Sequence, residues 1–157
     1  MSLSVKKVVF DNPPSVVEDE DGIKTFANPC TCWVSFVKND ELCTARFKFE
    51  DGFKTDGLSV PSVFRRWWPN WDASNPTYNL AGCVHDWLYC SEGAYGTFSR
   101  SECDDFLRGI MRESGKKRFI ASAADWAVGC FAGGKRHWGS DSLGSLGKCG
   151  FCLGVQK

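Results

Sequence analysis

The chain has 157 residues, of which 43% are hydrophobic, 14% aromatic and 24% charged. This length and apolar content fit one globular domain and exclude a mainly disordered chain. Its 19 basic and 19 acidic side chains cancel, which disfavours nucleic acid as a partner and restricts any peripheral membrane contact to a local patch. No stretch is typical of a secretory signal or a transmembrane segment, which predicts a protein made and kept in a reducing cytoplasm.

Alternation of apolar and polar residues marks the first part of the chain as β-structure. In residues 41–50, apolar side chains occupy every second position, which is the pattern of a half-buried strand. Similar but shorter patterns occur at residues 5–10 and 34–36, and Asp-Gly turn signals stand at 21–22 and 51–52. We therefore expect a small N-terminal antiparallel sheet.

From residue 59 onward the apolar period becomes that of helices. Capping residues, early prolines and terminal glycines set the expected bounds. The predicted helices are 59–68 with Ser59 as cap and Pro61 in the first turn, 76–90 capped by Asn75, 100–114 with the capping box Ser99 and Glu102, and 118–131. Strands followed by three to four helices predict the α+β class.

The last residues, 139–157, are rich in glycine and serine, and we expect a tail outside a single α+β domain of residues 1–138. Such a segment has too little apolar surface to order by itself. Phe151, Leu153 and Val155 nevertheless alternate as in an extended strand. The tail is therefore predicted to be mobile in a lone monomer and to order against a partner's sheet edge or groove.

The predicted helix at 76–90 carries the most suggestive chemistry. His85 and Asp86 are adjacent, so their side chains point about 100° apart and face different partners. Asp104 on the next helix is the candidate to orient His85, whose other ring nitrogen would then accept a proton from water as a general base. Asp86 faces the upstream loop, where it and Asp56 form a candidate calcium site.

Structural roles fit the same residues. His85 is also explained as a hydrogen-bonded helix histidine and Asp86 as an acid that tethers a loop. Asp56 follows Thr55 and precedes Gly57, a sequence typical of a turn in which the carboxylate accepts bonds from nearby backbone amides. Spacing alone does not separate these interpretations.

A cluster of three tryptophans and two arginines lies within residues 65–71. The simplest interpretation is that at least two of the tryptophans pack against the sheet. A protein or lipid surface is the second interpretation, and stacking on nucleic acid is the third because the chain carries no net positive charge.

The nine cysteines are an odd number in a chain without a secretory signal, so most are predicted to be free thiols. Cys149 and Cys152 form a CxxC motif, and Cys30 and Cys32 provide the two further thiolates for a candidate zinc site. His137 is a substitute ligand. Four other cysteines, Cys43, Cys83, Cys103 and Cys130, fall where an apolar side chain suits the local pattern, and they are predicted to be buried thiols.

The segments GFKTDGLSVPS, CVHDWLYC, SRSECDDFL and ADWAVGCFAGG, in this order, resemble an uncharacterised phage-encoded family of unknown function. The resemblance covers about residues 40–138 and implies a bacteriophage or prophage origin. Cys103 stands where the family usually has alanine. The positions that match the family pattern are Thr55, Asp56, Ser59, Pro61, His85, Asp86, Tyr89, Arg100 and Asp104.

The same helices also resemble phospholipase A2, in which an HDxxY helix precedes a helix whose aspartate orients the histidine. His85, Asp86, Tyr89 and Asp104 match this arrangement in order and type. The resemblance implies catalytic roles for His85, Asp104 and Tyr89, with calcium at Asp86. The sequence departs from the pattern because TDGLSVPS holds a single glycine where a glycine-rich calcium loop is expected.

Three functions remain as hypotheses. The first is a virion- or tail-associated accessory or structural protein, made in the host cytoplasm and carried in the virion, whose partners are other virion or tail proteins or a second copy. The second is a phospholipase-like hydrolase with His85 as base and calcium assistance. The third is an early host-interaction protein.

Overall fold

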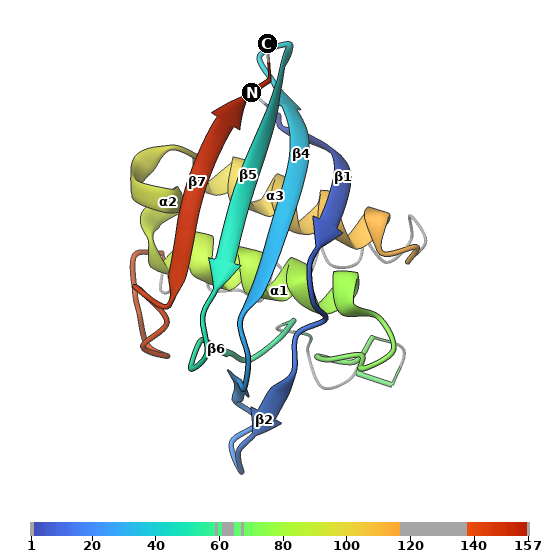
Figure 1. Cartoon of the computed structure of the whole chain (residues 1–157), viewed down its shortest axis with the longest axis vertical. Coiled ribbons are helices and arrows are strands. Elements are labelled where there is room, and N and C mark those ends of the chain that lie inside the picture. Colours follow the sequence, from blue (N-terminus) through green and yellow to red (C-terminus); the bar gives the residue numbers. More distant parts are fainter. Residues whose placement is uncertain (1, 59, 61–64, 67, 117–137, 157) are drawn as a thin grey trace.

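The computed structural model describes residues 2–58, 60, 65–66, 68–116 and 138–156. In this part of the chain an antiparallel sheet lies against a layer of helices, which confirms the predicted α+β class (Figure 1). The predicted helix at 118–131, together with Ser59, Pro61 and His137, lies outside the described residues.

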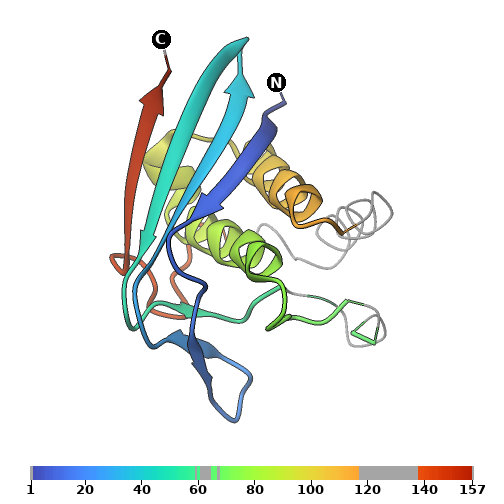
Figure 2. The ribbon, with the colours of Figure 1, turned by 45° about the vertical axis from the view of Figure 1, so that its right-hand side comes forward.

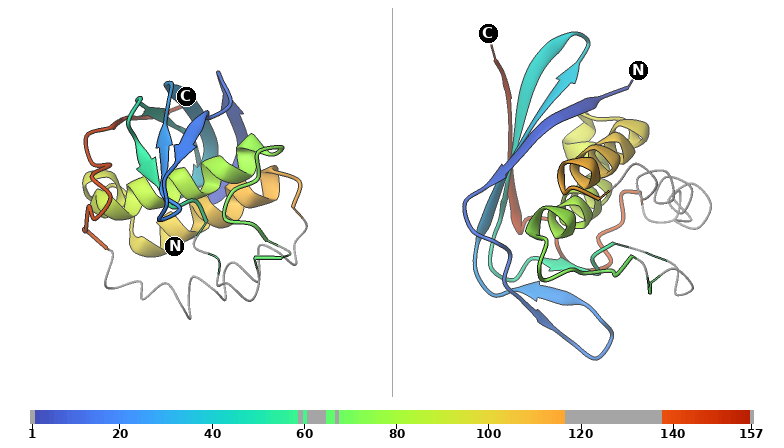
Figure 3. Two further views of the ribbon diagram at one scale, coloured as in Figure 1. Left: turned by 90° about the horizontal axis from the view of Figure 1, so that it is seen from below. Right: turned by 90° about the vertical axis from the view of Figure 1, so that its right-hand side faces the viewer.

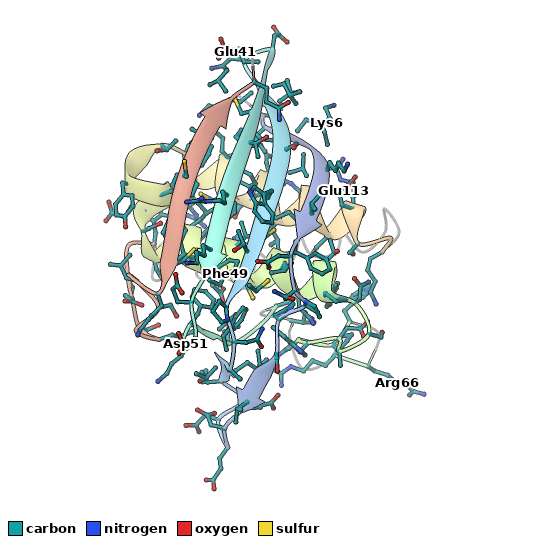
Figure 4. All side chains as sticks on the ribbon, viewed as in Figure 1. Lys6, Glu41, Phe49, Asp51, Arg66 and Glu113 are labelled. Atoms are coloured by element: carbon teal, nitrogen blue, oxygen red, sulfur yellow. The ribbon has the colours of Figure 1, made fainter. Side chains whose placement is uncertain are left out.

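The main sheet has the strand order β1-β4-β5-β7, with every neighbouring pair antiparallel. Asn39 and Asp40 join β4 and β5 with positive φ at both positions, the backbone that favours a tight hairpin. Glu41 and Phe49 mark the two ends of β5 in Figure 4. The strands are β1 (Ser4–Phe10), β4 (Cys30–Lys38), β5 (Glu41–Phe49) and β7 (Cys149–Val155).

The fourth strand, β7, corrects the prediction of a tail that orders only against a partner. β7 pairs with β5 along its length, from Cys43 opposite Val155 to Phe49 opposite Cys149. The glycines and serines that suggested disorder lie mostly before this strand, in turns over residues 138–147. The alternation of apolar side chains was therefore the correct signal, and the edge that it fills belongs to the same chain.

A smaller sheet of three strands extends from one end of the main sheet (Figure 3). Its strands are β2 (Val16–Glu18), β3 (Lys24–Phe26) and β6 (Lys54–Thr55). β6 leads directly into the segment after Thr55 that lies on α1. The small sheet thus sets where this segment begins.

Three helices cover one face of the main sheet (Figure 2). They are α1 (Pro76–Cys90), α2 (Glu92–Gly96) and α3 (Arg100–Glu113). The Asn75 side chain caps α1, and the predicted capping box of Ser99 and Glu102 is present at α3. No helix in the described ranges is both long and apolar enough to cross a bilayer.

The core between the two layers is built largely from aromatic rings. Phe47 is fully buried and contacts the Trp87 and Phe106 rings, at centroid distances of 6.1 Å to each. Phe36 contacts Phe106 at 5.0 Å. At the edge of this core, Lys38 of β4 forms an ion pair with Glu102 of α3 at 3.0 Å. The rings of both layers therefore interlock across the sheet and helix interface.

Phe151→Ala tests the contribution of β7 to stability. The Phe151 ring packs on Phe47 at 5.4 Å and on Trp87 at 5.5 Å. Because the side chain is only partly buried, we expect its loss to lower the free energy of unfolding by about 2 kcal/mol, less than at a fully buried phenylalanine. Urea unfolding measures the change. Val9→Ala, at a strand position that is 46% exposed, is the control and should change stability by about 0.5 kcal/mol or less. Equal effects of the two substitutions would contradict the packing of β7.

Candidate active site

The segment after β6 rests directly on α1 because Gly82 lacks a side chain. A Cβ at Gly82 would lie 2.9 Å from the carbonyl carbon of Gly57 and 3.2 Å from the backbone nitrogen of Leu58. Real Cβ atoms are almost never this close to backbone, so any larger residue would displace the segment. Gly82 stands one helical turn before Asp86 and on the same face of α1. The close approach thus brings the segment to the Asp86 carboxylate.

Asp86 is held by this segment as predicted. The Thr55 hydroxyl donates to Asp86 Oδ2 at 2.7 Å and accepts from the Gly57 backbone N–H at 2.9 Å. Burial, followed by the neighbouring Asp56 carboxylate, raises the pKa of Asp86 well above its ordinary value, although the Thr55 hydrogen bond acts in the opposite direction. The two acidic side chains therefore share one partly enclosed space in which a proton or a cation is favoured.

His85 turns toward α3, where it meets Asp104. His85 Nε2 lies 3.0 Å from Asp104 Oδ1, and the Tyr89 hydroxyl donates to the same oxygen at 2.6 Å. Arg100 Nε donates to the Tyr89 hydroxyl at 3.3 Å. The His85 and Tyr89 rings lie 4.2 Å apart. The predicted contact between His85 and Asp104 is confirmed, and Tyr89 and Arg100 extend it into a network of four side chains.

This network keeps Asp104 ionised. Burial opposes the charged form, but the hydrogen bonds from His85 and Tyr89 outweigh it, so the pKa of Asp104 lies below its ordinary value. Burial, followed by the Asp104 hydrogen bond, raises the pKa of Tyr89, so the phenol remains a donor. An ionised Asp104 favours the tautomer with the proton on His85 Nε2. In that tautomer Nδ1 carries no proton and is the acceptor nitrogen of the ring.

The donor set around Asp86 is suited to a hard cation. Asp56 and Asp86 contribute carboxylate oxygens and Thr55 a hydroxyl oxygen, the ligand type that calcium prefers. Within the described ranges no group of three or more acidic, histidine or cysteine side chains gathers around a single point. A calcium ion here would therefore need backbone carbonyls or water for its remaining ligands.

The candidate zinc site does not form among the described residues, which corrects that hypothesis. Residues three apart on a strand point to opposite faces of a sheet, and Cys149 is buried whereas Cys152 is exposed. Cys30 and Cys32 are both buried in β4. Cys30, Cys32 and Cys149 are buried free thiols. The predicted burial of Cys43, Cys83 and Cys103 is confirmed, and Cys130 lies outside the described residues. Burial raises the pKa of the Cys30 thiol to about 12.

The aromatic cluster divides between core and surface. Trp71 is partly buried and packs against the core, with the Lys24 ammonium 6.0 Å from its ring centre. Arg65 and Arg66 are exposed, and Arg66 points away from the fold (Figure 4). Trp67 lies outside the described residues. The packing interpretation therefore holds for Trp71.

Two features of the site were missed from sequence. The first is Gly82, whose missing side chain lets the backbone of Gly57 and Leu58 lie against α1. The second is Trp138, whose ring packs edge-on against that of Tyr89 with 5.1 Å between ring centres. A glycine inside a helix is unfavourable by roughly 1 kcal/mol relative to alanine, and this is a signal for close approach that the sequence did contain. Trp138 gave no such signal, because its contact joins segments far apart in the chain.

Asp86→Asn is expected to stabilise the protein at neutral and higher pH. A carboxyl whose folded pKa lies above its unfolded value loses its contribution to stability as pH rises from the unfolded toward the folded pKa. Asparagine imitates the protonated form at every pH and can still accept from Thr55. The thermal midpoint of the variant, measured with EDTA present, should exceed that of wild type at about pH 8, and the gap should narrow toward about pH 4.

Asp104→Asn is the matched comparison, and it should change the thermal midpoint in the opposite direction. The pKa of Asp104 is lowered by folding, so its contribution is present above the unfolded pKa and is lost as pH falls through the folded pKa. Its replacement should therefore lower the thermal midpoint at about pH 8 and matter less in acid. If both variants shift the midpoint in the same direction at about pH 8, the assignment of the two carboxyls is wrong.

Comparison with known proteins places the chain in a family. No curated protein and no solved structure shows significant similarity to it. The model of one protein family matches residues 34–128, which is more than half of the chain and includes Thr55, Asp86 and Asp104. The description of that family is "Protein of unknown function (DUF1353)". The chain belongs to the DUF1353 family.

Proposed function

We propose that this protein is a hydrolase in which His85 is the general base. The observation that carries the proposal is the 3.0 Å contact between His85 Nε2 and Asp104, with Tyr89 bonded to the same carboxylate oxygen. A carboxylate that fixes one ring nitrogen leaves the other able to take a proton from water. This is the arrangement needed for attack of a water molecule on an ester carbonyl.

The reaction follows from these positions. His85 Nδ1 accepts a proton from water as the water oxygen bonds to the carbonyl carbon, and the imidazolium then returns the proton to the leaving alcohol oxygen. Asp104 stabilises the imidazolium, while Tyr89 and Arg100 keep the carboxylate oriented. A calcium ion held by Asp86 and Asp56 would polarise the ester carbonyl. The order of His85, Asp86, Tyr89 and Asp104 resembles that of phospholipase A2, so a phospholipid ester is the first substrate to test.

Fatty-acid release from phosphatidylcholine in mixed micelles with calcium tests the proposal. His85→Gln should lower the rate by about 10²–10⁴-fold, the usual contribution of a general base. Asp104→Asn should produce a comparable loss because the two residues act as a unit. Circular dichroism should show that both variants stay folded.

Asp105→Asn is the matched control. It removes a carboxylate one residue from Asp104 that instead accepts from the Leu3 backbone N–H at 2.8 Å, and activity should remain within about twofold of wild type. No calcium-dependent release by wild type would discard the phospholipase assignment. Equal rates for His85→Gln and wild type would discard His85 as the base.

A second candidate is an accessory or structural protein of a phage particle, in which the His85 and Asp104 pair only ties α1 to α3. The exposed apolar side chains of β7, with Leu153 38% and Val155 55% exposed, support a role in assembly. Mass spectrometry of purified phage particles tests this candidate. A structural protein should be present in the particles at a reproducible stoichiometry, whereas an early host-interaction protein should be absent.

A further inference from the structure

One edge of β7 is unpaired in the described sheet. β7 is the last strand in the order β1-β4-β5-β7, and it forms the outer border of the sheet in Figure 1. The Lys148 carbonyl accepts from the Glu50 N–H, and the Gln156 N–H donates to the Leu42 carbonyl. The backbone N–H and C=O groups of the even-numbered residues therefore point toward β5. Backbone groups alternate along a strand in an antiparallel pair. The groups that face the open edge are those of Cys149, Phe151, Leu153 and Val155.

This edge lacks the features that normally keep strands apart. Natural edge strands carry charged residues, prolines or bulges, or are covered. Residues 149–155 include no charge and no proline, and the register with β5 continues without a bulge. Exposed fractions of 38% at Leu153 and 55% at Val155 leave apolar surface beside the open edge. The strand is therefore suited to further pairing.

Two glycines of β7 have room for a side chain. A Cβ at Gly150 would lie 3.7 Å from its nearest neighbour, and one at Gly154 would lie 4.0 Å away, both ordinary contact distances. Neither glycine has positive φ, and side chains on a strand point out of the plane in which strands pair. Both positions can therefore carry a cysteine without blocking a strand that pairs with the open edge.

We propose that two copies of the protein pair through β7, antiparallel, about a twofold axis at Cys152. The two sheets then form one continuous sheet of eight strands, four from each copy. In this register Phe151 lies opposite Leu153 of the second copy and Gly150 lies opposite Gly154. All seven residues of β7 are paired, and every outward N–H faces a carbonyl.

The pattern of β7 favours a second copy over an unrelated partner. The glycines at 150 and 154 and the large apolar side chains at 151 and 153 lie symmetrically about Cys152, so the strand is complementary to itself. Lys148 lies opposite Gln156 of the second copy, so no like charges meet at the ends of the strand. On the face of the sheet that contacts the helices, Phe151 of each copy lies beside Leu153 of the other copy, which is a favourable apolar pair.

Cross-linking tests the register. Cys152 of the two copies forms a pair without hydrogen bonds, at about 4.5 Å between Cα atoms, which is within disulfide range. Mild oxidation should therefore give a covalent dimer joined at Cys152, as mapped by mass spectrometry. In a Cys152→Ser background, Gly150→Cys and Gly154→Cys should each cross-link poorly alone and efficiently when mixed. Equal yields from single and mixed variants would overturn the register.

Sedimentation equilibrium tests the dimer itself. Leu153→Pro removes an N–H that faces the open edge and none that bonds to β5, so it should raise the dissociation constant by about tenfold or more. The thermal midpoint of this variant should change little at a protein concentration where the wild type is monomeric. Leu153→Ala retains that N–H and should weaken the dimer less. A wild-type protein that stays monomeric at all concentrations, or a dimer that Leu153→Pro leaves unchanged, would overturn the proposal.

Discussion

Burial of α1 on almost all of its sides is the constraint on which the rest of the structure depends. Ten of its 15 residues are buried. Trp87 contacts the sheet, His85 contacts α3, and Gly82 lies beneath the segment after β6. A helix enclosed in this way is fixed in rotation, because turning it would break packing on one side and polar contacts on another. The directions of His85 and Asp86 are therefore set by the core.

The packing around α1 also shifts the pKa values of two acidic residues of the site in opposite directions. The pKa of Asp104 is lowered by donors that bond to its ionised form, whereas burial and the Asp56 carboxylate raise the pKa of Asp86. Pairs of titratable groups pushed apart in this way are common where proteins divide acid and base tasks. Here the two environments differ because His85 and Asp86 are adjacent on one helix and point to different partners. His85 contacts Asp104 on α3, and Asp86 contacts the segment after β6.

Local signals in the sequence were sufficient for much of the fold and the site. The capping box at Ser99 and the alternation in β5 were readable because both depend on residues close in the chain. The His85 and Asp104 contact was readable from helical spacing. The sequence also contained a helix glycine at 82 and the alternation of β7, but it did not show which segment lies on Gly82 or which strand pairs with β7, since both depend on segments far away in sequence. The zinc hypothesis failed because it ignored the two-residue period of a strand.

Placement of β7 beside β5 has a consequence for synthesis of the chain. Gln156 Nε2 bonds to Thr44 Oγ1, across a separation of 112 residues, and closure of such long loops slows folding. During translation β4 and β5 leave the ribosome long before β7. Until residues 149–155 have emerged, the nascent chain carries an open β5 edge, a surface on which a chaperone that holds extended segments would act.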